Sequence, residues 1–283
     1  MRFLTWNVWW RFGSWERRRE AILAVLRAER PDVCGLQEVW DAEGTNLAGW
    51  LAGELGMHWA WGPGEVLPHW PDRPGGVRAG VGNAVLSRWP VIRSETRRLP
   101  VADGPDEVRV ALFALVDAPG ARVPFFTTHL HSAPGGSAVR CAQARALAAF
   151  VAERAGEGSF PPVVTGDFNA PPDSAELRCF HDASAAGAES GAVPGAGLTD
   201  VWRAAPAGAA WATWDPANPL VAGPAKVRAR IDYIHTGPPD RGGGGTVRSA
   251  RRAGDAPVAG VWPSDHAAVI AELAAPTAPT APD

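Results

Sequence analysis

Two short polar motifs, each placed after an apolar run, constrain this chain more than any other feature of its sequence. Gly166-Asp167-Phe168-Asn169 follows Pro162-Val163-Val164-Thr165, and Ser264-Asp265-His266 comes soon after Ala259-Gly260-Val261-Trp262. Short apolar runs are typical of buried strands, and loops at strand ends are where sheet proteins carry catalytic groups. Carboxylates, amides and a histidine at such positions favour metal-assisted hydrolysis by water.

Strand and helix patterns alternate along the chain, which is typical of an α/β fold. Apolar residues at helical spacing predict helices over residues 15–30, with Ser14 as the N-cap, 47–55 and 138–154. Strands are expected at residues 2–8, 33–36, 84–86, 108–116, 123–130, 163–165, 230–235 and 267–273. Residues that favour turns and irregular structure predict loops over residues 62–82 and 183–197.

Composition indicates a globular protein with a sizeable core. Of the 283 residues, 46% are hydrophobic and 20% are charged, which excludes disorder for most of the chain. No interior linker divides the sequence, so we expect one domain over residues 1–273 and a disordered Pro/Ala-rich tail over residues 274–283. The net charge of −3 provides no general basic field for long nucleic acid.

Cysteine usage and the absence of targeting patterns favour an intracellular protein. The three cysteines, Cys34, Cys141 and Cys179, show neither CxxC nor ligand-like spacing, so they imply neither a disulfide framework nor a zinc knuckle. The first residues lack the pattern of a signal peptide, and no apolar stretch reaches the length of a membrane span. We therefore expect a cytoplasmic monomer with no transmembrane segment and no obligate protein partner.

Seven motifs lie at strand ends or along strands in a fixed order. They are Thr5-Trp6-Asn7, Leu36-Gln37-Glu38-Val39, Gly82-Asn83-Ala84-Val85-Leu86-Ser87-Arg88, Thr128-His129-Leu130, Gly166-Asp167-Phe168-Asn169, Arg230-Ile231-Asp232-Tyr233-Ile234 and Ser264-Asp265-His266. In this order the motifs resemble those of the endonuclease/exonuclease/phosphatase superfamily, which has the fold of pancreatic-type deoxyribonuclease. The resemblance implies a four-layer α/β/β/α sandwich with two mainly antiparallel sheets packed face to face.

The resemblance also implies a metal site. Glu38 is the expected primary ligand of Mg²⁺ or Mn²⁺, with help from Asn7 and Asp265. Magnesium prefers oxygen ligands and keeps several waters, which suits a site with few carboxylates.

The same resemblance assigns catalytic roles to five further residues. Asp167 would orient or deprotonate the attacking water, and Asn169 and His129 would donate hydrogen bonds to phosphoryl oxygens. His266 would contact the phosphate or its nucleophile, and Asp232 would fix the tautomer of that imidazole.

One histidine assignment stays open in the sequence. Leu-His-Ser-Ala-Pro resembles the deoxyribonuclease pattern and favours His131, whereas the deadenylase-like pattern favours His129, which we prefer. Strand alternation would put both side chains on one face. A zinc site built on this H-x-H pair is disfavoured because no Asp-His follows it.

Four residues, in addition to His131, are candidates for substrate binding. Trp9 and Trp10 directly follow the Asn7 motif and are expected to alternate sides at the mouth of the site. Trp214 lies in a loop before the Asp232 strand, where an aromatic residue commonly meets the leaving group in relatives. Asn83 is the remaining candidate, although a Gly-Asn turn before a strand needs no catalytic role.

The expected function is a metal-dependent phosphodiesterase, with a nuclease-type substrate preferred. The single lysine, Lys226, and the aromatic residues near Asn7 favour short nucleic acid or a small phosphodiester over a long duplex. The alternatives are a sphingomyelinase-like lipid phosphodiesterase, a phosphomonoesterase, and a catalytically silent binding module of the same fold. The binding module is disfavoured because the polar residues of the motifs are intact.

Overall fold

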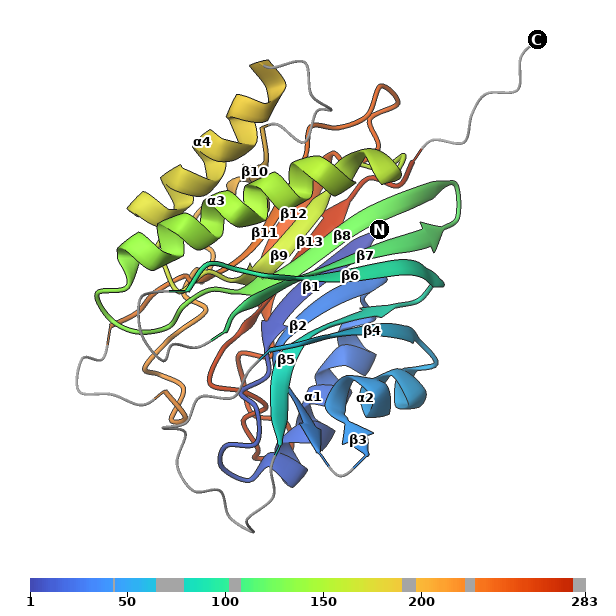
Figure 1. Cartoon of the computed structure of the whole chain (residues 1–283). Coiled ribbons are helices and arrows are strands. Elements are labelled where there is room, and N and C mark those ends of the chain that lie inside the picture. The colour runs from blue at the N-terminus through green and yellow to red at the C-terminus, as the bar shows by residue number, and fades with distance from the viewer. Residues whose placement is uncertain (43, 65–78, 102–107, 190–196, 222–226, 277–283) are drawn as a thin grey trace.

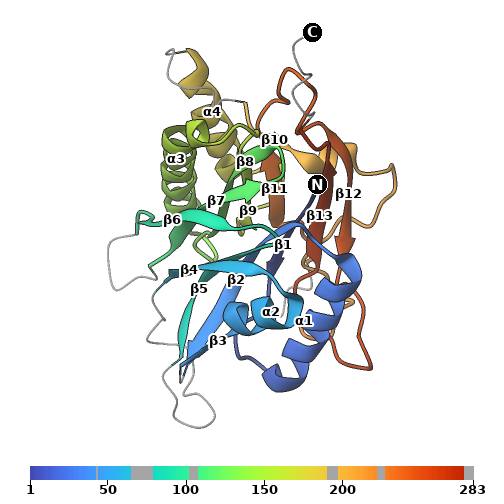
Figure 2. The same cartoon turned by 90° about the vertical axis from the view of Figure 1, so that its right-hand side faces the viewer.

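The computed structural model describes residues 1–42, 44–64, 79–101, 108–189, 197–221 and 227–276, and of residues 183–189 the backbone alone. These residues form two β-sheets packed face to face, with helices on both outer faces (Figures 1 and 2). The arrangement confirms the four-layer sandwich expected from the sequence.

The first sheet carries α1 (Trp15–Glu29) and α2 (Leu47–Leu55) on its outer face. Its strand order is β12 (Val247–Ala253), β13 (Ala268–Leu273), β1 (Arg2–Asn7), β2 (Val33–Ala42), β5 (Gly80–Ser87) and β4 (His58–Pro63), with β3 (Thr45–Asn46) beside β2.

The second sheet carries α3 (Ser137–Arg154) and α4 (Ala175–Glu189) on its outer face. Its strand order is β10 (Thr199–Asp200), β11 (Asp232–Thr236), β9 (Val163–Asp167), β8 (Ala121–His129), β7 (Val110–Ala118) and β6 (Val91–Arg98). Two 3₁₀ turns, Ala155–Glu157 and Val201–Ala204, follow α3 and β10.

Each sheet contains one parallel pair of strands at its centre, and the other pairings between the described strands are antiparallel. The parallel pairs are β1–β2 and β8–β9, connected through α1 and α3 respectively. Because the strands of a parallel pair run the same way, their carboxyl ends lie at the same edge of the sheet. This topology brings the last residues of β1, β8 and β9, and Glu38 within β2, to one end of the sandwich.

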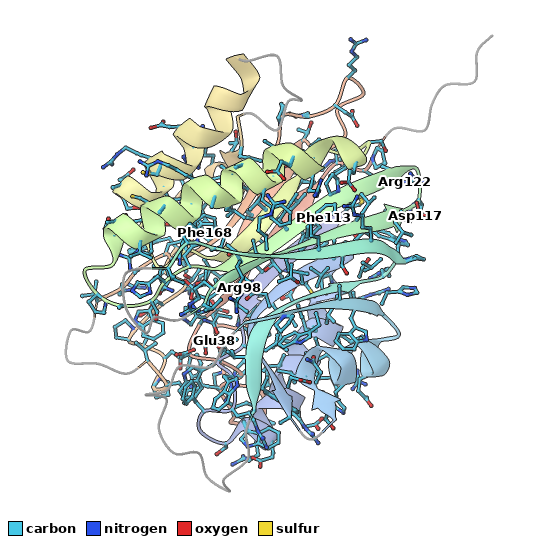
Figure 3. All side chains as sticks on the ribbon, viewed as in Figure 1. Glu38, Arg98, Phe113, Asp117, Arg122 and Phe168 are labelled. Atoms are coloured by element: carbon cyan, nitrogen blue, oxygen red, sulfur yellow. The ribbon has the colours of Figure 1, made fainter. Side chains whose placement is uncertain are left out.

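Side-chain alternation along the strands builds three apolar layers. On β1, Leu4 and Trp6 pack beneath α1 and α2, whereas Phe3 points to the other sheet. Phe113 of β7 and Phe168 pack beneath α3 and α4 (Figure 3). Both sheets are therefore covered on both faces, which explains why their central strands read as continuous apolar runs.

Two glycines allow the central strands to approach closely near the polar end. A Cβ on Gly35 of β2 would lie 2.3 Å from Thr165 Oγ1 of the other sheet. Gly166 has a φ of +154°, and a Cβ there would lie 2.3 Å from Thr128 O. The glycine of the Gly-Asp-Phe-Asn motif is thus needed for the contact between β8 and β9.

Five strands and one helix are not predicted from the sequence. The apolar patterns miss β4, β6, β10 and β12, which are edge strands, and the two-residue β3. No helix is expected over α4, which runs to Glu189 into the stretch 183–197 for which the sequence predicts a loop, because alanine favours helices. Ser14 precedes α1, but its side chain makes no capping hydrogen bond.

Regular structure also extends into the loop expected over residues 62–82 and into the tail expected over residues 274–283. β4 and β5 extend into residues 62–82, of which residues 65–78 lie outside the described part. Ala274 pairs with Thr246 through its backbone N–H, so hydrogen bonding continues into the expected tail, while residues 277–283 lie outside the described part. Among the described residues, no helix combines the length and apolar character needed to span a membrane.

Candidate active site

The candidate site lies where β1, β2, β8 and β9 meet at one end of the sandwich. Asn7 ends β1, and its amide Nδ2 donates to Glu38 Oε1 and to Asp167 Oδ2, both at 3.1 Å. Glu38 belongs to β2 and Asp167 ends β9, so one amide group joins the two sheets. Figure 3 shows Glu38 at the end of the sandwich opposite Asp117 and Arg122, which flank the turn between β7 and β8.

Glu38 faces the site because β2 is irregular at this point. Its φ is 53°, and the register between β2 and β5 shifts between Leu36 and Val39. A bulge of this kind re-aims one side chain and leaves the rest of the strand paired. The Glu38 side chain is 15% exposed; its Oε1 accepts from Asn7 Nδ2, and its Oε2 is buried.

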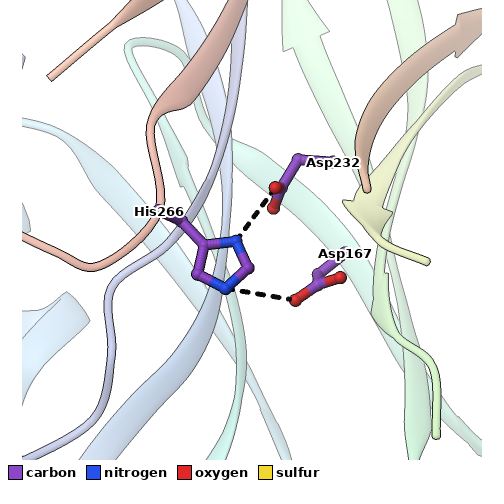
Figure 4. A group of neighbouring side chains, drawn as sticks. All are labelled: Asp167, Asp232 and His266. Atoms are coloured by element: carbon purple, nitrogen blue, oxygen red, sulfur yellow. Dashed lines mark hydrogen bonds and ion pairs between the residues drawn. The ribbon is translucent and has the colours of Figure 1, made fainter. Parts of the chain in front are cut away.

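His266 lies between two buried carboxylates (Figure 4). Its Nδ1 is 2.9 Å from Asp232 Oδ2, and its Nε2 is 3.8 Å from Asp167 Oδ2. Asp232 pairs directly with Asp167 in the antiparallel register of β11 and β9, which brings the two carboxylates together. The hydroxyl of Thr213 accepts a hydrogen bond from Asp232 N at 3.3 Å and holds the start of β11.

The charges of this group are strongly coupled. Burial opposes protonation of His266, yet the carboxylates of Asp232 and Asp167 raise the pKa of His266 well above its usual 6.5. Burial and the charge of Asp232 raise the pKa of Asp167 to about 7. Near neutral pH, the His266 imidazolium therefore lies between the carboxylate of Asp232 and the carboxyl group of Asp167. The Asp167 group gains and loses its proton near neutral pH, as a general base must.

The same three residues have the spacing of a metal-binding group, since their ligand atoms lie within 4.8 Å of one another. However, Nδ1 of His266 is hydrogen-bonded to Asp232 Oδ2 at 2.9 Å, which engages this ring nitrogen with a carboxylate. We therefore interpret Asp232, His266 and Asp167 as a hydrogen-bonded triad.

His129 faces the triad from the end of β8. Its Nε2 lies 3.0 Å from Asn169 Nδ2 and 3.4 Å from Asp167 Oδ2, and its Nδ1 lies 4.0 Å from Glu38 Oε1. Burial, with the charge of Arg109, lowers the pKa of His129 well below 6.5, so the ring is neutral. Because Asn169 Nδ2 is a donor to Nε2, the ring proton is assigned to Nδ1.

His131 occupies a different place from His129. The strand β8 ends at His129, so alternation does not continue, and the expectation that both side chains share one face is wrong. The backbone N–H of His131 donates to Gln143 Oε1 at 2.8 Å, and its ring packs so closely on Gly136 that a Cβ there would lie 2.3 Å away. The side chain of His131 thus lies against the start of α3.

The neighbouring residue Ser264 fixes the position of Asp265 in the site. The Ser264 hydroxyl donates to Asn7 O at 2.6 Å and accepts from His266 N at 3.2 Å, which fixes the loop against β1. Burial raises the pKa of Asp265 to about 7, an effect that His266 opposes and the carboxylate of Glu38 supports.

The oxygen donors of Glu38, Asp265 and Asn7 fit a hard divalent cation. Two carboxylates whose charges repel each other are ligand types that Mg²⁺ and Mn²⁺ prefer, and the amide oxygen of Asn7, which accepts from Trp9 N, has a second lone pair for a cation. A bound cation would offset that repulsion. These residues are the ones that the sequence predicts for the metal, and their assignment remains a proposal.

Two residues that support the site are missed by the sequence analysis. Thr213 lies in an irregular segment without a motif, and nothing in the sequence marks its hydroxyl. Arg18 is 2% exposed on α1, and it falls on the helix face of Ile22 and Val25, at spacings of four and seven residues. A charged residue on an apolar helix face was a usable signal, because such a side chain needs buried partners.

The aromatic candidates Trp214 and Trp9 lie near the site in different ways. The Trp214 ring stands edge-on to the ring of His266, with centroids 4.9 Å apart, and its backbone pairs with that of His266. Trp9 is half-buried, donates its backbone N–H to Asn7 Oδ1 at 2.9 Å, and packs its ring 4.7 Å from the guanidinium of Arg18.

Trp10 and Asn83 have structural roles. Trp10 is 4% exposed and donates its indole N–H to Gly80 O, so the prediction that it reaches the substrate is wrong. Its φ of 34° follows the φ of 57° at Trp9, and this left-handed turn replaces the expected strand-like alternation. Asn83 is 3% exposed, and its Nδ2 donates to Val110 O at 2.9 Å, which ties the two sheets together.

The fold resembles several solved structures over nearly its whole length. An endonuclease/exonuclease/phosphatase from Beutenbergia cavernae is 26% identical, with the match covering 99% of this chain and 73% of that chain at a TM-score of 0.71. TDP2 from D. rerio, complexed with single-strand DNA product, is 22% identical, with coverages of 96% and 97% and a TM-score of 0.68. A mannosyl-6-phosphatase from Bacteroides thetaiotaomicron is 17% identical, with coverages of 96% and 99% and a TM-score of 0.65. No curated protein sequence gives a significant match.

The fold and the family match support a phosphate-ester hydrolase. A sequence model of the Endonuclease/Exonuclease/phosphatase family matches residues 4–266. The chain therefore belongs to this family, as the order of its motifs predicts.

Proposed function

We propose that this protein is a divalent-metal-dependent phosphodiesterase that acts on short nucleic acid or a small phosphodiester. The observation that carries the proposal is the position of His266 between Asp232 and Asp167, next to the Asn7–Glu38 contact. This arrangement combines a positive charge, a carboxyl group with a pKa near neutrality and a set of oxygen ligands within one buried group.

The residues of the triad would act on water and phosphate. Asp167, with its pKa of about 7, accepts a proton from the attacking water and orients it. The Nε2–H of His266 faces Asp167 and would donate to a phosphoryl oxygen bound beside that residue. Asp232 accepts a hydrogen bond from Nδ1–H and stabilises the imidazolium.

Two neutral donors would complete the phosphate contacts. The Asn169 amide donates to Leu130 O and His129 Nε2, both at 3.0 Å, and would exchange one of these contacts for a phosphoryl oxygen when substrate binds. His129 is neutral and supplies an N–H without adding charge to the site.

Glu38, Asp265 and Asn7 would hold the cation. When bound, Mg²⁺ or Mn²⁺ supplies positive charge that stabilises the charge developing on the phosphate and its leaving group. Asn7 orients Glu38 through its amide, and Ser264 fixes Asp265 relative to β1.

Trp214 supports the choice of a small or single-stranded substrate. Its ring borders His266, so a base or another flat leaving group would stack beside the reacting phosphate. A relative in fold, TDP2, is solved with a single-strand DNA product, whereas another is a mannosyl-6-phosphatase. A phosphomonoester is therefore the second substrate class to test.

A substrate panel tests the proposal. Plasmid DNA, single-stranded oligonucleotides, a small chromogenic diester, sphingomyelin and sugar phosphates are incubated with Mg²⁺, Mn²⁺ or EDTA, for the wild type and for Asp167→Asn. We expect diester cleavage that needs the cation and is lost in Asp167→Asn. Hydrolysis of monoesters alone would reject the phosphodiesterase, and no cleavage of any ester would reject the hydrolase.

A further inference from the structure

Arg18 forms an unusual buried centre beneath the candidate site. Within the described part of the chain, the guanidinium donates six hydrogen bonds of 2.7–3.0 Å to backbone carbonyl oxygens. The acceptors are the carbonyls of Val8, Trp9, Trp10, Phe12 and Pro263. The side chain is 2% exposed, so its donors are satisfied by protein groups in the absence of bulk water.

These carbonyls belong to two segments that are far apart in the sequence. Val8 to Phe12 directly follow Asn7, whereas Pro263 directly precedes Ser264 and Asp265. The Nη1 atom contacts both segments, since it donates to Val8 O at 2.9 Å and to Pro263 O at 3.0 Å.

The first segment also orients a side chain of the site. Trp9 N donates to Asn7 Oδ1 at 2.9 Å, which leaves Asn7 Nδ2 to donate to Glu38 and Asp167. Trp9 and Trp10 both adopt left-handed backbone conformations that are unfavourable for residues with a Cβ. Such a turn persists only when its surroundings fix it, and Arg18 binds the carbonyl of each residue.

We propose that Arg18 is a positioning residue of the cation site, which sets the spacing and orientation of Asn7 and Asp265 by tying together the backbone segments that carry them. The proposal rests on the proposed function, in which these two residues hold the cation. It assigns to Arg18 no contact with the substrate.

The chemistry of the guanidinium fits this role better than that of other side chains. Five N–H groups in a rigid plane can hold two segments in one geometry, whereas the ammonium of lysine is a single point with three donors. Burial lowers the pKa of Arg18 to about 10, an effect that the carboxylates of Asp265 and Glu38 oppose.

Cation affinity measured without substrate tests the proposal. Mn²⁺ binding is followed by calorimetry for the wild type, Arg18→Lys, Arg18→Gln and the control Arg17→Gln, which changes an exposed arginine on the same helix. We expect Arg18→Lys and Arg18→Gln to bind Mn²⁺ about ten- to a hundredfold more weakly, as for other groups that orient ligands. Arg17→Gln should match the wild type.

A second readout separates positioning from general stability. Amide hydrogen exchange at Trp9 and His266, whose N–H groups bond to Asn7 Oδ1 and Ser264 Oγ, should accelerate in the Arg18 variants and not in Arg17→Gln. Wild-type Mn²⁺ affinity in a folded Arg18→Lys protein would overturn the proposal, and so would failure of both Arg18 variants to fold, since Arg18 would then determine folding.

The outcome is distinct from that of the proposed function. Arg18-dependent Mn²⁺ binding in a protein that cleaves no ester would reject the hydrolase and keep the role of Arg18. Cation-dependent cleavage with Mn²⁺ affinity unchanged in Arg18→Lys would reject the role of Arg18 alone.

Discussion

The contact between Asp232 and His266 gives a prediction whose size follows from the structure. Both side chains are buried, and Oδ2 lies 2.9 Å from Nδ1. Unit charges at this distance attract by about 6 kcal/mol at an effective dielectric constant of about 20. Burial of the two charges offsets part of this, so we expect a measured coupling of about 2–5 kcal/mol.

A double-mutant cycle measures that coupling. Asp232→Asn, His266→Gln and the double variant are unfolded in urea at pH 6 with EDTA present. Each single variant should lose about 3–5 kcal/mol of unfolding free energy, because it leaves a buried charge without its partner. The double variant should lose less than the sum of the two, by the size of the coupling.

The pH dependence gives the sign of the effect. Because the pKa of His266 is raised, its contribution to stability is complete below pH 6.5 and declines as the pH rises toward the raised value. In Asp232→Asn this alkaline decline should become smaller, because only Asp167 and Asp265 would then raise the pKa of His266. Turnover at saturating Mn²⁺ should fall by similar factors in both single variants and little further in the double variant, since the pair acts as a unit.

A matched control uses another buried ion pair. Glu176 lies 3.0 Å from Arg140 between α4 and α3, away from the triad. Glu176→Gln should lower stability and leave turnover unchanged. Additive losses of stability and activity in the Asp232/His266 cycle would refute the reasoning, because they would mean that the two side chains act separately.

Other predictions concern stability at low pH and substrate contacts. His235 is buried without a hydrogen-bond partner for either ring nitrogen among the described residues, and burial lowers its pKa to about 3. The neutral ring of His235 therefore contributes its full stability above pH 6.5, and this stability is lost by about 1.4 kcal/mol per pH unit as the pH falls toward 3. Between pH 6.5 and 5, the unfolding free energy of His235→Phe, measured in urea, should rise by about 2 kcal/mol relative to that of the wild type. An equal gain in the exposed control His58→Phe would contradict this. Trp214→Ala should raise the Michaelis constant for an oligonucleotide more than it lowers turnover, since stacking is made equally before and during reaction, whereas the control Trp211→Ala should change neither. The rate of cleavage of that oligonucleotide should fall only slightly as the salt concentration rises. A steep salt dependence with preference for duplex plasmid would instead favour a deoxyribonuclease-type function.

The sequence predicts the parts of the site that depend on strand ends. Asn7, His129 and Asp167 each end an apolar run. They are expected to lie close together once β1, β8 and β9 are recognised as members of parallel strand pairs. Glu38 is predicted from its motif, but its inward direction depends on a bulge that periodicity does not reveal. The catalytic and metal-binding roles of these residues stay predictions until variants are measured.

Features that depend on tertiary contacts are harder to predict from the sequence. Trp10 follows Asn7 directly and looks like a residue of the site mouth, but a left-handed turn places it in the core. The stabilising partner of that turn, Arg18, is recognisable only as a charge on an apolar helix face. The domain limits over 1–273 and the cytoplasmic location also stay predictions.

The most direct test of the central claim is the Mn²⁺ dependence of phosphodiester hydrolysis in the wild type and in Glu38→Gln. The Glu38 carboxylate is an oxygen donor of the proposed cation site, and its amide isostere keeps the shape while removing the charge. In EDTA, both proteins should be inactive toward a chromogenic diester. Added Mn²⁺ should restore the wild type, while Glu38→Gln should stay slower by about two orders of magnitude and the exposed control Glu20→Gln should behave as wild type. Full turnover in EDTA, or wild-type turnover of Glu38→Gln at the same Mn²⁺ concentration, would contradict a cation-dependent hydrolase at this end of the sandwich.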